Sequence, residues 1–300
     1  MSKYSHKLKM FCVKPGDDCR KTIQEQVSEQ DYCKVHHDST QPKLSNGTQL
    51  QCRGNVTFLK TPKPFVALAS FPGSGNTWTR QLLEDLTGVY TGSIYYEDNF
   101  NGSKVCPLTG GVFIIKTHLR RNHVDHIRCK KLNISTPRSF DQAIIILRNP
   151  YDAMIAEFNR RHGRRDGGKL GVVNRTAFTT DAWKSFVKER SENWRQMILY
   201  WTGTFNKPYH IVVYEKMAEN KCEELMKLAE FLSVDILPSV LNCLLNNDKI
   251  KWKRLKPSWV NKETLFDEKL RTIVNNDISK VLKSTSDKNL SSVLINYLFY

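Results

Sequence analysis

The chain has 300 residues, and its 46 Lys and Arg against 30 Asp and Glu give a formal net charge of +16. This length suffices for one large α/β domain with a short extension. The positive charge favours polyanionic partners such as phosphorylated cofactors, acidic glycans, nucleic acid or anionic membrane, against the simpler interpretation of a solubilising surface. No apolar run approaches the roughly 20 residues that span a bilayer, and the first residues lack the apolar stretch of a signal peptide. The sequence therefore indicates a soluble chain, which leaves a cytoplasmic location open, or a fragment without its membrane anchor.

Cysteines and glycosylation sequons bear on the compartment. None of the eight cysteines forms a C-x-x-C pair, which disfavours a zinc or redox motif. Disulfides in an oxidising lumen fit better than reduced buried thiols. N-x-S/T sequons are more frequent than chance predicts and favour a secretory compartment. They occur at Asn46, Asn55, Asn101, Asn133, Asn174 and Asn289.

The chain divides into two parts by composition. Residues 1–62 are polar, carry four of the cysteines and end in the sequence TPKP, whose prolines favour extended backbone. We therefore predict an N-terminal extension over 1–62 and one domain over 63–300.

Apolar runs alternate with helical patterns from residue 63 onward. β-rich runs at 65–71, 111–118, 142–148 and 210–215 are each followed by polar residues, and three of them lead into amphipathic stretches. Such alternation predicts an α/β fold, a three-layer αβα arrangement around a central parallel sheet. In open sheets of this kind, ligands bind at the carboxyl ends of the strands.

The stretch ASFPGSGNTWTR follows the first predicted strand. Gly73 and Gly75 allow a tight turn whose N–H groups converge on one anion, and Ser74, Asn76 and Thr77 add side-chain donors. The Walker lysine is absent. Arg80 is the candidate for the missing cation, and a plain structural turn is the alternative. Trp78 is predicted either to pack on an adenine or to belong to the core.

The second and third predicted strands end in IIKTH and ILRNP. Lys116 and His118 lie two residues apart, so on an extended backbone both face one way. A lysine can stabilise a developing oxyanion and a histidine can accept a proton near neutral pH, although a lone histidine is often structural. Arg148 can hold a second phosphate or pair with a nearby carboxylate.

Three other clusters are less specific. His123, His126 and Cys129 are spaced by three, but the surrounding basic residues disfavour a metal, and we predict none. The basic segments at 119–131 and 159–169 suit an anionic glycan or form solvated loops. Trp183, Trp194 and Trp201 share a helical stretch and are predicted in the core.

Together these motifs resemble sulfotransferases that use 3′-phosphoadenosine 5′-phosphosulfate (PAPS), a family with a P-loop-like fold. FPGSGNTW (71–78) resembles the PKSGTTW segment that binds the 5′-phosphosulfate, KTH (116–118) the catalytic strand end, and RNPYD (148–152) the 3′-phosphate segment. VVYEKM is similar to a segment that places Tyr214 near the adenine, and KWKR to a late basic segment that places Lys253 and Arg254 at the 3′-phosphate.

The narrower resemblance, over about residues 64–285, is to the WSC-domain-containing sulfotransferases, which sulfate sialic acid on glycans. It implies a glycan or glycoprotein acceptor, a Golgi location and PAPS as co-substrate without metal. The implied site comprises Pro72, Gly73, Ser74, Gly75, Asn76, Thr77, Trp78, Arg148, Tyr214, Lys253 and Arg254 for the donor, with His118 as base, Lys116 assisting and Glu97 as the alternative base. We add Arg80 to the donor residues as a hypothesis for the missing cation.

This sequence departs from the family at three points. Gly73 stands at the lysine position of the turn, and Ala156 stands where the wider family has a serine for the 3′-phosphate. No WSC module or membrane anchor is recognisable in residues 1–62, so membrane attachment would need an anchor outside this chain.

Three rival functions are weighed against sulfuryl transfer. A nucleotide kinase is disfavoured because no Gly-Lys-Ser/Thr follows the turn and no acidic strand end is evident for Mg²⁺. A nucleic-acid-binding protein explains the charge but lacks the interleaved basic and aromatic motifs of RNA modules, so we predict no nucleic-acid partner. An inactive, sulfotransferase-like binder of acidic glycans stays open because the lysine and serine positions are altered.

Overall fold

The computed structural model describes residues 52, 54–95, 97–124, 127–134, 136–163, 171–246 and 258–299. Within these ranges, the four predicted strands form one parallel sheet with a short fifth strand at its edge, in the order β2-β3-β1-β6-β7. The strands are β1 (Val66–Ser70), β2 (Gly92–Ser93), β3 (Ile114–Thr117), β6 (Gln142–Leu147) and β7 (Tyr209–Val213). This sheet confirms the predicted α/β class.

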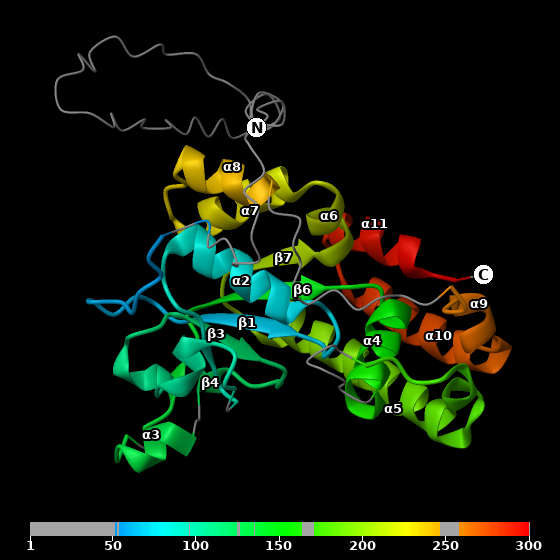
Figure 1. Ribbon diagram of the computed structural model, residues 1–300. Helices are drawn as coiled ribbons and strands as arrows, with labels where there is room; N and C mark the ends of the chain where they lie inside the picture. Colours follow the sequence, from blue (N-terminus) through cyan, green and yellow to red (C-terminus); the bar gives the residue numbers. More distant parts are fainter. Residues whose placement is uncertain are drawn as a thin grey trace, which may run out of the picture. The chain divides into compact units, whose positions relative to one another are not determined.

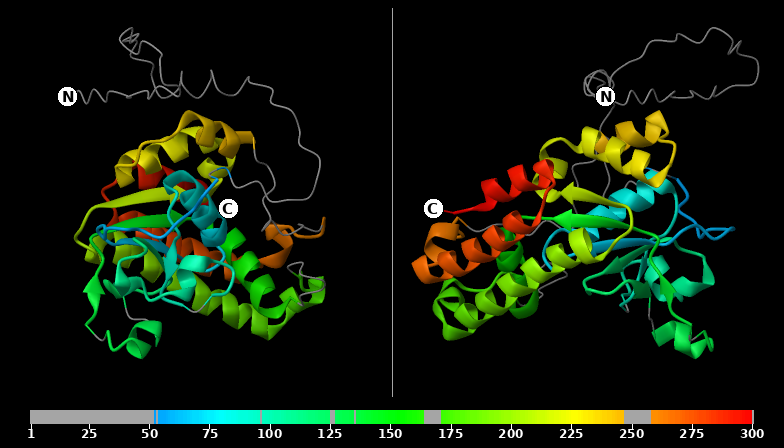
Figure 2. Two further views of the ribbon diagram at one scale, coloured as in Figure 1. Left: turned by 60° about the vertical axis from the view of Figure 1, so that its left-hand side comes forward. Right: turned by 180° about the vertical axis from the view of Figure 1, so that it is seen from behind.

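Helices follow the strands and cover the sheet. Figure 1 shows α2, α7 and α8 above the sheet and α5 beneath it, while α10 runs along α5 and α11 along α10, as the view from behind also shows (Figure 2). The helices are α2 (Asn76–Thr87), α3 (Ile127–Lys131), α4 (Pro150–His162), α5 (Asp181–Leu199), α6 (Tyr214–Glu219), α7 (Lys221–Leu232), α8 (Pro238–Asn246), α9 (Lys262–Leu265), α10 (Glu268–Ser284) and α11 (Lys288–Tyr297).

Shorter elements fill the connections. A two-residue antiparallel ladder joins β4 (His123–Val124) to β5 (Arg138–Ser139). The single helical turns are η1 (Asn101–Lys104), η2 (Pro107–Thr109), η3 (Arg175–Thr179) and the π-helical η4 (Tyr200–Thr204). None of the helices in the described ranges is both long and apolar enough to cross a membrane.

Local sequence explains where the helices next to the site begin and end. Gly75 precedes α2 and Gly88 ends it, both in the left-handed conformation, and the Gly88 N–H donates to the carbonyl oxygen of Glu84. α4 begins at Pro150, directly after β6, and the Asn149 side chain accepts a hydrogen bond from the Tyr151 N–H. Both helices therefore start at the carboxyl edge of the sheet.

The three tryptophans of the α5 region lie in the core, as predicted. Trp183, Trp194 and Trp201 are each at most 1% exposed. The indole N–H of Trp183 donates to the carbonyl oxygen of Leu265, 2.7 Å away, so its polar atom is satisfied inside the core. This packing fixes α5 beneath the strands that carry the site.

The described residues before 63 contact the domain that follows them. Thr57 bridges to Val89, and the Leu59 N–H donates to the carbonyl oxygen of Gly111. Cys52 forms a disulfide with Cys243 on α8. A second disulfide joins Cys106 to Cys129, so the predicted disulfides are confirmed.

Candidate functional site

The turn after β1 adopts a backbone that only glycine accommodates at two positions. Gly73 has φ +86°, and a Cβ there would lie 2.3 Å from the carbonyl oxygen of Ala153 on α4. Gly75 has φ +91°, and a Cβ there would lie 2.6 Å from the ring of Tyr214. The turn is thus packed between α4 and the start of α6, with the N-terminus of α2 behind it.

Polar atoms in and beside this turn are buried without a partner among the described residues. They are the hydroxyl of Ser74, the amide oxygen of Asn76 and the Nε of Arg148. Leaving buried polar groups unpaired costs about 1–3 kcal/mol each, so native proteins keep them mainly where a ligand or water completes the bonding. Two of these groups, the Ser74 hydroxyl and the Arg148 Nε, can donate a hydrogen bond. The donor set therefore fits an anionic ligand such as a phosphate ester.

Arg148 joins this turn to two aromatic residues. Its NH1 donates to the carbonyl oxygen of Gly73 at 2.6 Å, and its guanidinium carbon lies 4.3 Å from the centre of the Tyr214 ring. Trp78 is buried and packs edge-on against Tyr214 with ring centres 5.4 Å apart. The structure therefore brings four predicted donor-site residues together.

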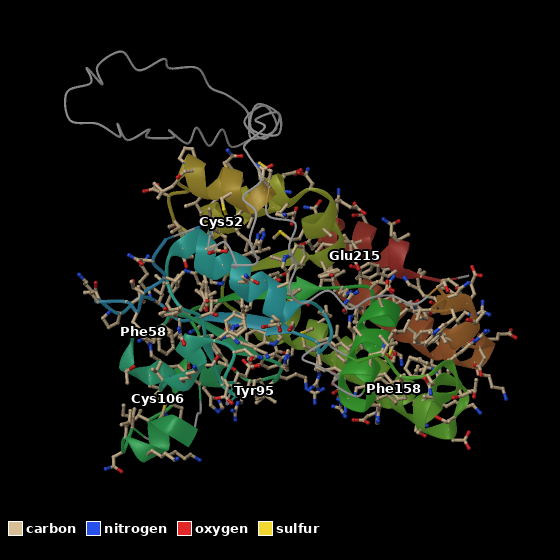
Figure 3. All side chains as sticks on the ribbon, in the orientation of Figure 1. Cys52, Phe58, Tyr95, Cys106, Phe158 and Glu215 are labelled. Carbon is tan, nitrogen blue, oxygen red and sulfur yellow. A yellow bond between two sulfur atoms is a disulfide. The ribbon has the colours of Figure 1, made fainter. Side chains whose placement is uncertain are left out.

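Glu215 holds the Arg148 segment in place, a contact that the sequence analysis missed because it expected residues 210–215 to form a strand. The strand ends at Val213, and Glu215 lies on α6, where Figure 3 labels it. One oxygen accepts from the Asn149 N–H at 3.0 Å, and the other accepts from the Tyr297 hydroxyl of α11 at 2.7 Å.

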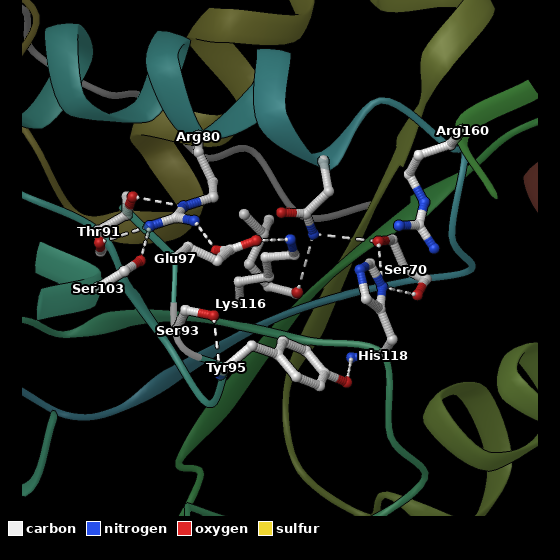
Figure 4. Close-up of polar contacts among 12 residues, drawn as sticks. Ser70, Arg80, Thr91, Ser93, Tyr95, Glu97, Ser103, Lys116, His118 and Arg160 are labelled. Carbon is white, nitrogen blue, oxygen red and sulfur yellow. Dashed lines mark hydrogen bonds and ion pairs between the residues drawn. The ribbon is translucent and has the colours of Figure 1, made fainter. Parts of the chain in front are cut away.

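Glu97 lies between two cations (Figure 4). Its carboxylate accepts from the Lys116 ammonium and, at 2.6 Å, from Arg80. Burial raises the pKa of Glu97, but these two charges outweigh burial and hold it below its usual value. Burial lowers the pKa of Lys116, and Glu97 opposes that shift. The carboxylate thus keeps a buried ammonium charged at the strand end.

Arg80 has partners other than those expected. Its side chain is 1% exposed, and it donates to Thr91, Ser103 and Glu97 while stacking on the ring of Phe100. These contacts lie away from the glycine turn (Figure 4). The hypothesis that Arg80 replaces the absent lysine is therefore not supported. Arg80 instead pairs with Glu97, which also binds Lys116, because its position on α2 points its side chain toward β2.

The ring of His118 is oriented by Ser70. Nδ1 lies 2.7 Å from the carbonyl oxygen of Ser70, which can only accept, so Nδ1 carries the proton and Nε2 keeps its lone pair. The His118 backbone N–H donates to the hydroxyl of Tyr95, whose ring stacks on the imidazole. Burial and the charge of Lys116 lower the pKa of His118 to about 4. At neutral pH the imidazole is uncharged and able to accept a proton.

The remaining predicted residues fall into three sets. Pro72 and Thr77 are half-buried at the turn and in the first turn of α2. Lys253, Arg254 and His126 lie outside the described residues. Cys129 is disulfide-bonded to Cys106, so its sulfur is not free to bind a metal.

Glu157 is a residue that reasoning from sequence did not single out, whereas Arg160 belongs to the basic segment 159–169 that was suggested for an anionic glycan. Glu157 on α4 is fully buried and ion-paired with Arg160, whose charge reaches Lys116 and Glu97 of the site. Their spacing of three on a helix was the available signal, but it does not show which face of α4 meets the turn.

The arrangement combines an anion-binding turn, a buried ammonium and a neutral imidazole at one edge of the sheet. Charge that develops on a leaving phosphate can be stabilised at the turn, and a proton can be accepted at His118. Such a constellation suits transfer of an anionic group to a hydroxyl.

Comparison with known proteins agrees with this architecture. The sulfotransferase of mouse named SULT7A1, solved in complex with PAP, superposes with a TM-score of 0.51 at 17% identity, covering 79% of this chain and 90% of that one, which shows a shared fold. A WSCD family member of Drosophila melanogaster, CG9164, is 31% identical over 206 residues, covering 66% of this chain and 59% of its own length. One from Aedes aegypti, AAEL009094, is 28% identical over 239 residues, covering 77% of this chain and 65% of its own length.

The chain thus spans about three fifths of the length of the curated relatives that it matches. The profile of the sulfotransferase domain family matches residues 63–289, which include every strand of the sheet and every predicted site residue that the structure describes. On this match, the chain belongs to the sulfotransferase domain family.

Proposed function

We propose that this chain transfers a sulfuryl group from PAPS to a hydroxyl of a glycan, with sialic acid as the candidate sugar. One observation carries the proposal: the free Nε2 of a neutral His118 and the charged Lys116 stand at the strand end next to a turn with unpaired buried donors. Sialic acid rests on the resemblance to WSC-domain-containing sulfotransferases.

The donor would lie along the turn. The α2 N-terminus and the Ser74 hydroxyl would bind the 5′-phosphosulfate, and Arg148 would bind the 3′-phosphate with Tyr214 and Trp78 near the adenine. In the described part of the site, Gly73 and Ala156 supply no side-chain donors where the wider family has lysine and serine.

The acceptor hydroxyl would be oriented by His118. Its oxygen attacks sulfur in line with the bond to the 5′-phosphate while its proton passes to Nε2 of His118. The new O–S bond forms as the bond between sulfur and the phosphate oxygen breaks, so adenosine 3′,5′-bisphosphate (PAP) leaves. Lys116 would stabilise the charge on the sulfuryl oxygens, and the turn amides the charge on the departing phosphate.

Glu97 is the alternative base, but both of its oxygens are occupied by cations in this structure. His118→Ala and Glu97→Gln distinguish the two. We expect His118→Ala to abolish sulfation while PAP binding is retained, and Glu97→Gln to keep measurable turnover. Retained turnover in His118→Ala with loss in Glu97→Gln would reverse the assignment.

Thermal shift compares PAP with ATP and Mg²⁺ as ligands. We expect PAP to raise the melting temperature, and a shift with ATP and Mg²⁺ alone would favour a kinase instead. Mass spectrometry of a glycan library incubated with PAPS would then identify the acceptor. PAP binding without transfer to any hydroxylated acceptor would favour an inactive binder of acidic glycans.

We also propose that the chain acts in the secretory pathway, in the Golgi by resemblance. All five sequon asparagines in the described ranges are exposed, and two disulfides join segments distant in sequence. Expression through the secretory route should give a mass loss on treatment with peptide N-glycosidase that disappears when those asparagines are changed to glutamine. An unchanged mass after treatment of the wild type would contradict this location.

A further inference from the structure

Arg160 and Arg161 share one buried carboxylate. Glu157 is 0% exposed, and Arg160 approaches it with Nε at 2.5 Å and NH2 at 2.7 Å, while Arg161 approaches with Nε at 2.7 Å. Burial opposes ionisation of Glu157, but the two guanidinium groups outweigh it and lower its pKa. The cluster therefore carries one positive charge in excess.

The two arginines point to different places. In the view of Figure 4, Arg160 is on the side of Ser70 and His118, whereas the guanidinium of Arg161 faces the ring of Phe186 on α5, 5.9 Å from its centre. Arg160 is half-exposed, and its NH1 donates to no acceptor among the described residues. Its charge also reaches Lys116 and Glu97. Glu157 thus holds one edge of the Arg160 guanidinium, and the other edge is presented to the reaction centre.

The register of α4 separates Arg160 from the donor turn. Gly73 meets α4 at Ala153 and at the Glu157 backbone, about one helical turn before Arg160. The turn already has its own partners in Arg148 and the α2 N-terminus. The charge of Arg160 instead reaches Lys116 and Glu97, at the strand end that leads into His118.

We propose that Arg160 binds a carboxylate of the acceptor and so selects sugars that carry a negative charge close to the hydroxyl that is sulfated. This inference rests on the proposed sulfuryl transfer and names the acceptor class for the same site. Glu157 is a positioning residue in this arrangement, because it fixes the guanidinium by two parallel bonds.

The test compares Arg160→Ala with Arg161→Ala. Both variants remove one arginine from Glu157 and leave the other to neutralise it, so the fold should tolerate each. The acceptor probes are two matched pairs: the methyl α-glycoside of N-acetylneuraminic acid with its carboxamide, and methyl β-D-glucuronide with methyl β-D-glucoside. Acceptor binding is measured by calorimetry in the presence of PAP, and KM and kcat are measured with PAPS.

We expect the wild type to prefer the anionic member of at least one pair. Arg160→Ala should weaken binding and raise KM for that member by about 10- to 100-fold, the loss of a charge-assisted pair, with binding of the neutral member and of PAP unchanged. Arg160→Lys should restore part of the preference, and Arg161→Ala should match the wild type.

Three results would overturn the inference: no preference for either anionic probe, equal losses for both members of a pair, or a loss of PAP affinity in Arg160→Ala, which would assign the guanidinium to the donor. Failure of the wild type to bind PAP would instead overturn the proposed function itself.

Discussion

The guanidinium of Arg80 lies 2.6 Å from the carboxylate of Glu97, and the same carboxylate accepts from Lys116. Arg80 is itself fixed by Thr91, which follows α2, and by Ser103 in η1. The position of the Lys116 ammonium at the strand end is therefore set by a largely buried network of side chains.

Removing the charge of Glu97 should change the pH range over which the enzyme works. Glu97 raises the pKa of Lys116 against the effect of burial, so in Glu97→Gln this pKa falls further. We expect the alkaline limb of the kcat profile to move to lower pH. Asp98→Asn, a change at an exposed neighbour, serves as the control and should leave the profile unchanged. An alkaline limb that stays in place would contradict this role of Glu97.

Replacing Arg80 should destabilise the fold. Arg80→Met leaves Glu97 with one cation and removes the donors to Thr91 and Ser103, and breaking such buried pairs costs about 3–5 kcal/mol. The free energy of unfolding in urea measures this loss. Lys184→Met, which breaks an exposed pair with Asp181, should cost less than about 1 kcal/mol. Equal losses in the two variants would mean that the buried network adds nothing.

Restoring the family's lysine at position 73 should weaken donor binding. In Gly73→Lys the Cβ would meet the carbonyl oxygen of Ala153, and a lysine would have to adopt a positive φ. We expect a lower melting temperature and a loss of the shift that PAP produces. Gly203→Lys adds the same charge where a Cβ would meet nothing within 4 Å, and should bind PAP as the wild type does. A tighter complex in Gly73→Lys would show that α4 can move aside.

His118 should make stability depend on pH in a defined window. Its pKa is about 4 in the folded chain against 6.5 without the fold, so folding favours the neutral imidazole. Its contribution is complete above pH 6.5 and is lost as the pH falls toward 4. As the pH falls over this range, the difference in unfolding free energy between the wild type and His118→Gln should shrink. The carboxylates and His210 are present in both proteins, so their effects cancel from this difference. If this difference in unfolding free energy did not change with pH, the His118 ring would not be shielded from solvent.

Much of the fold could be predicted because buried parallel strands are continuous apolar runs, as Ile144 and its neighbours on β6 show. The two-residue strands β2, β4 and β5 are too short to leave a pattern. Tyr214 was placed on a strand because apolar residues precede it, but the chain turns there into α6.

The site was harder to predict where contacts join distant segments. Pairing of Lys116 with Glu97 and of Asn149 with Glu215 depends on how loops fold back over the sheet, which local spacing does not specify. The partners of Arg80 could not be predicted for the same reason: its place on α2 was correct, but its contacts come from Thr91 and Ser103.

The contact of Tyr297 with Glu215 has a practical consequence. Glu215 anchors the backbone of Asn149, so a side chain in the last helix of the chain braces the arginine strand end from almost 150 residues away. Truncation before this helix, or a bulky fusion that unwinds it, should therefore weaken nucleotide affinity even though nothing in the glycine turn has been altered.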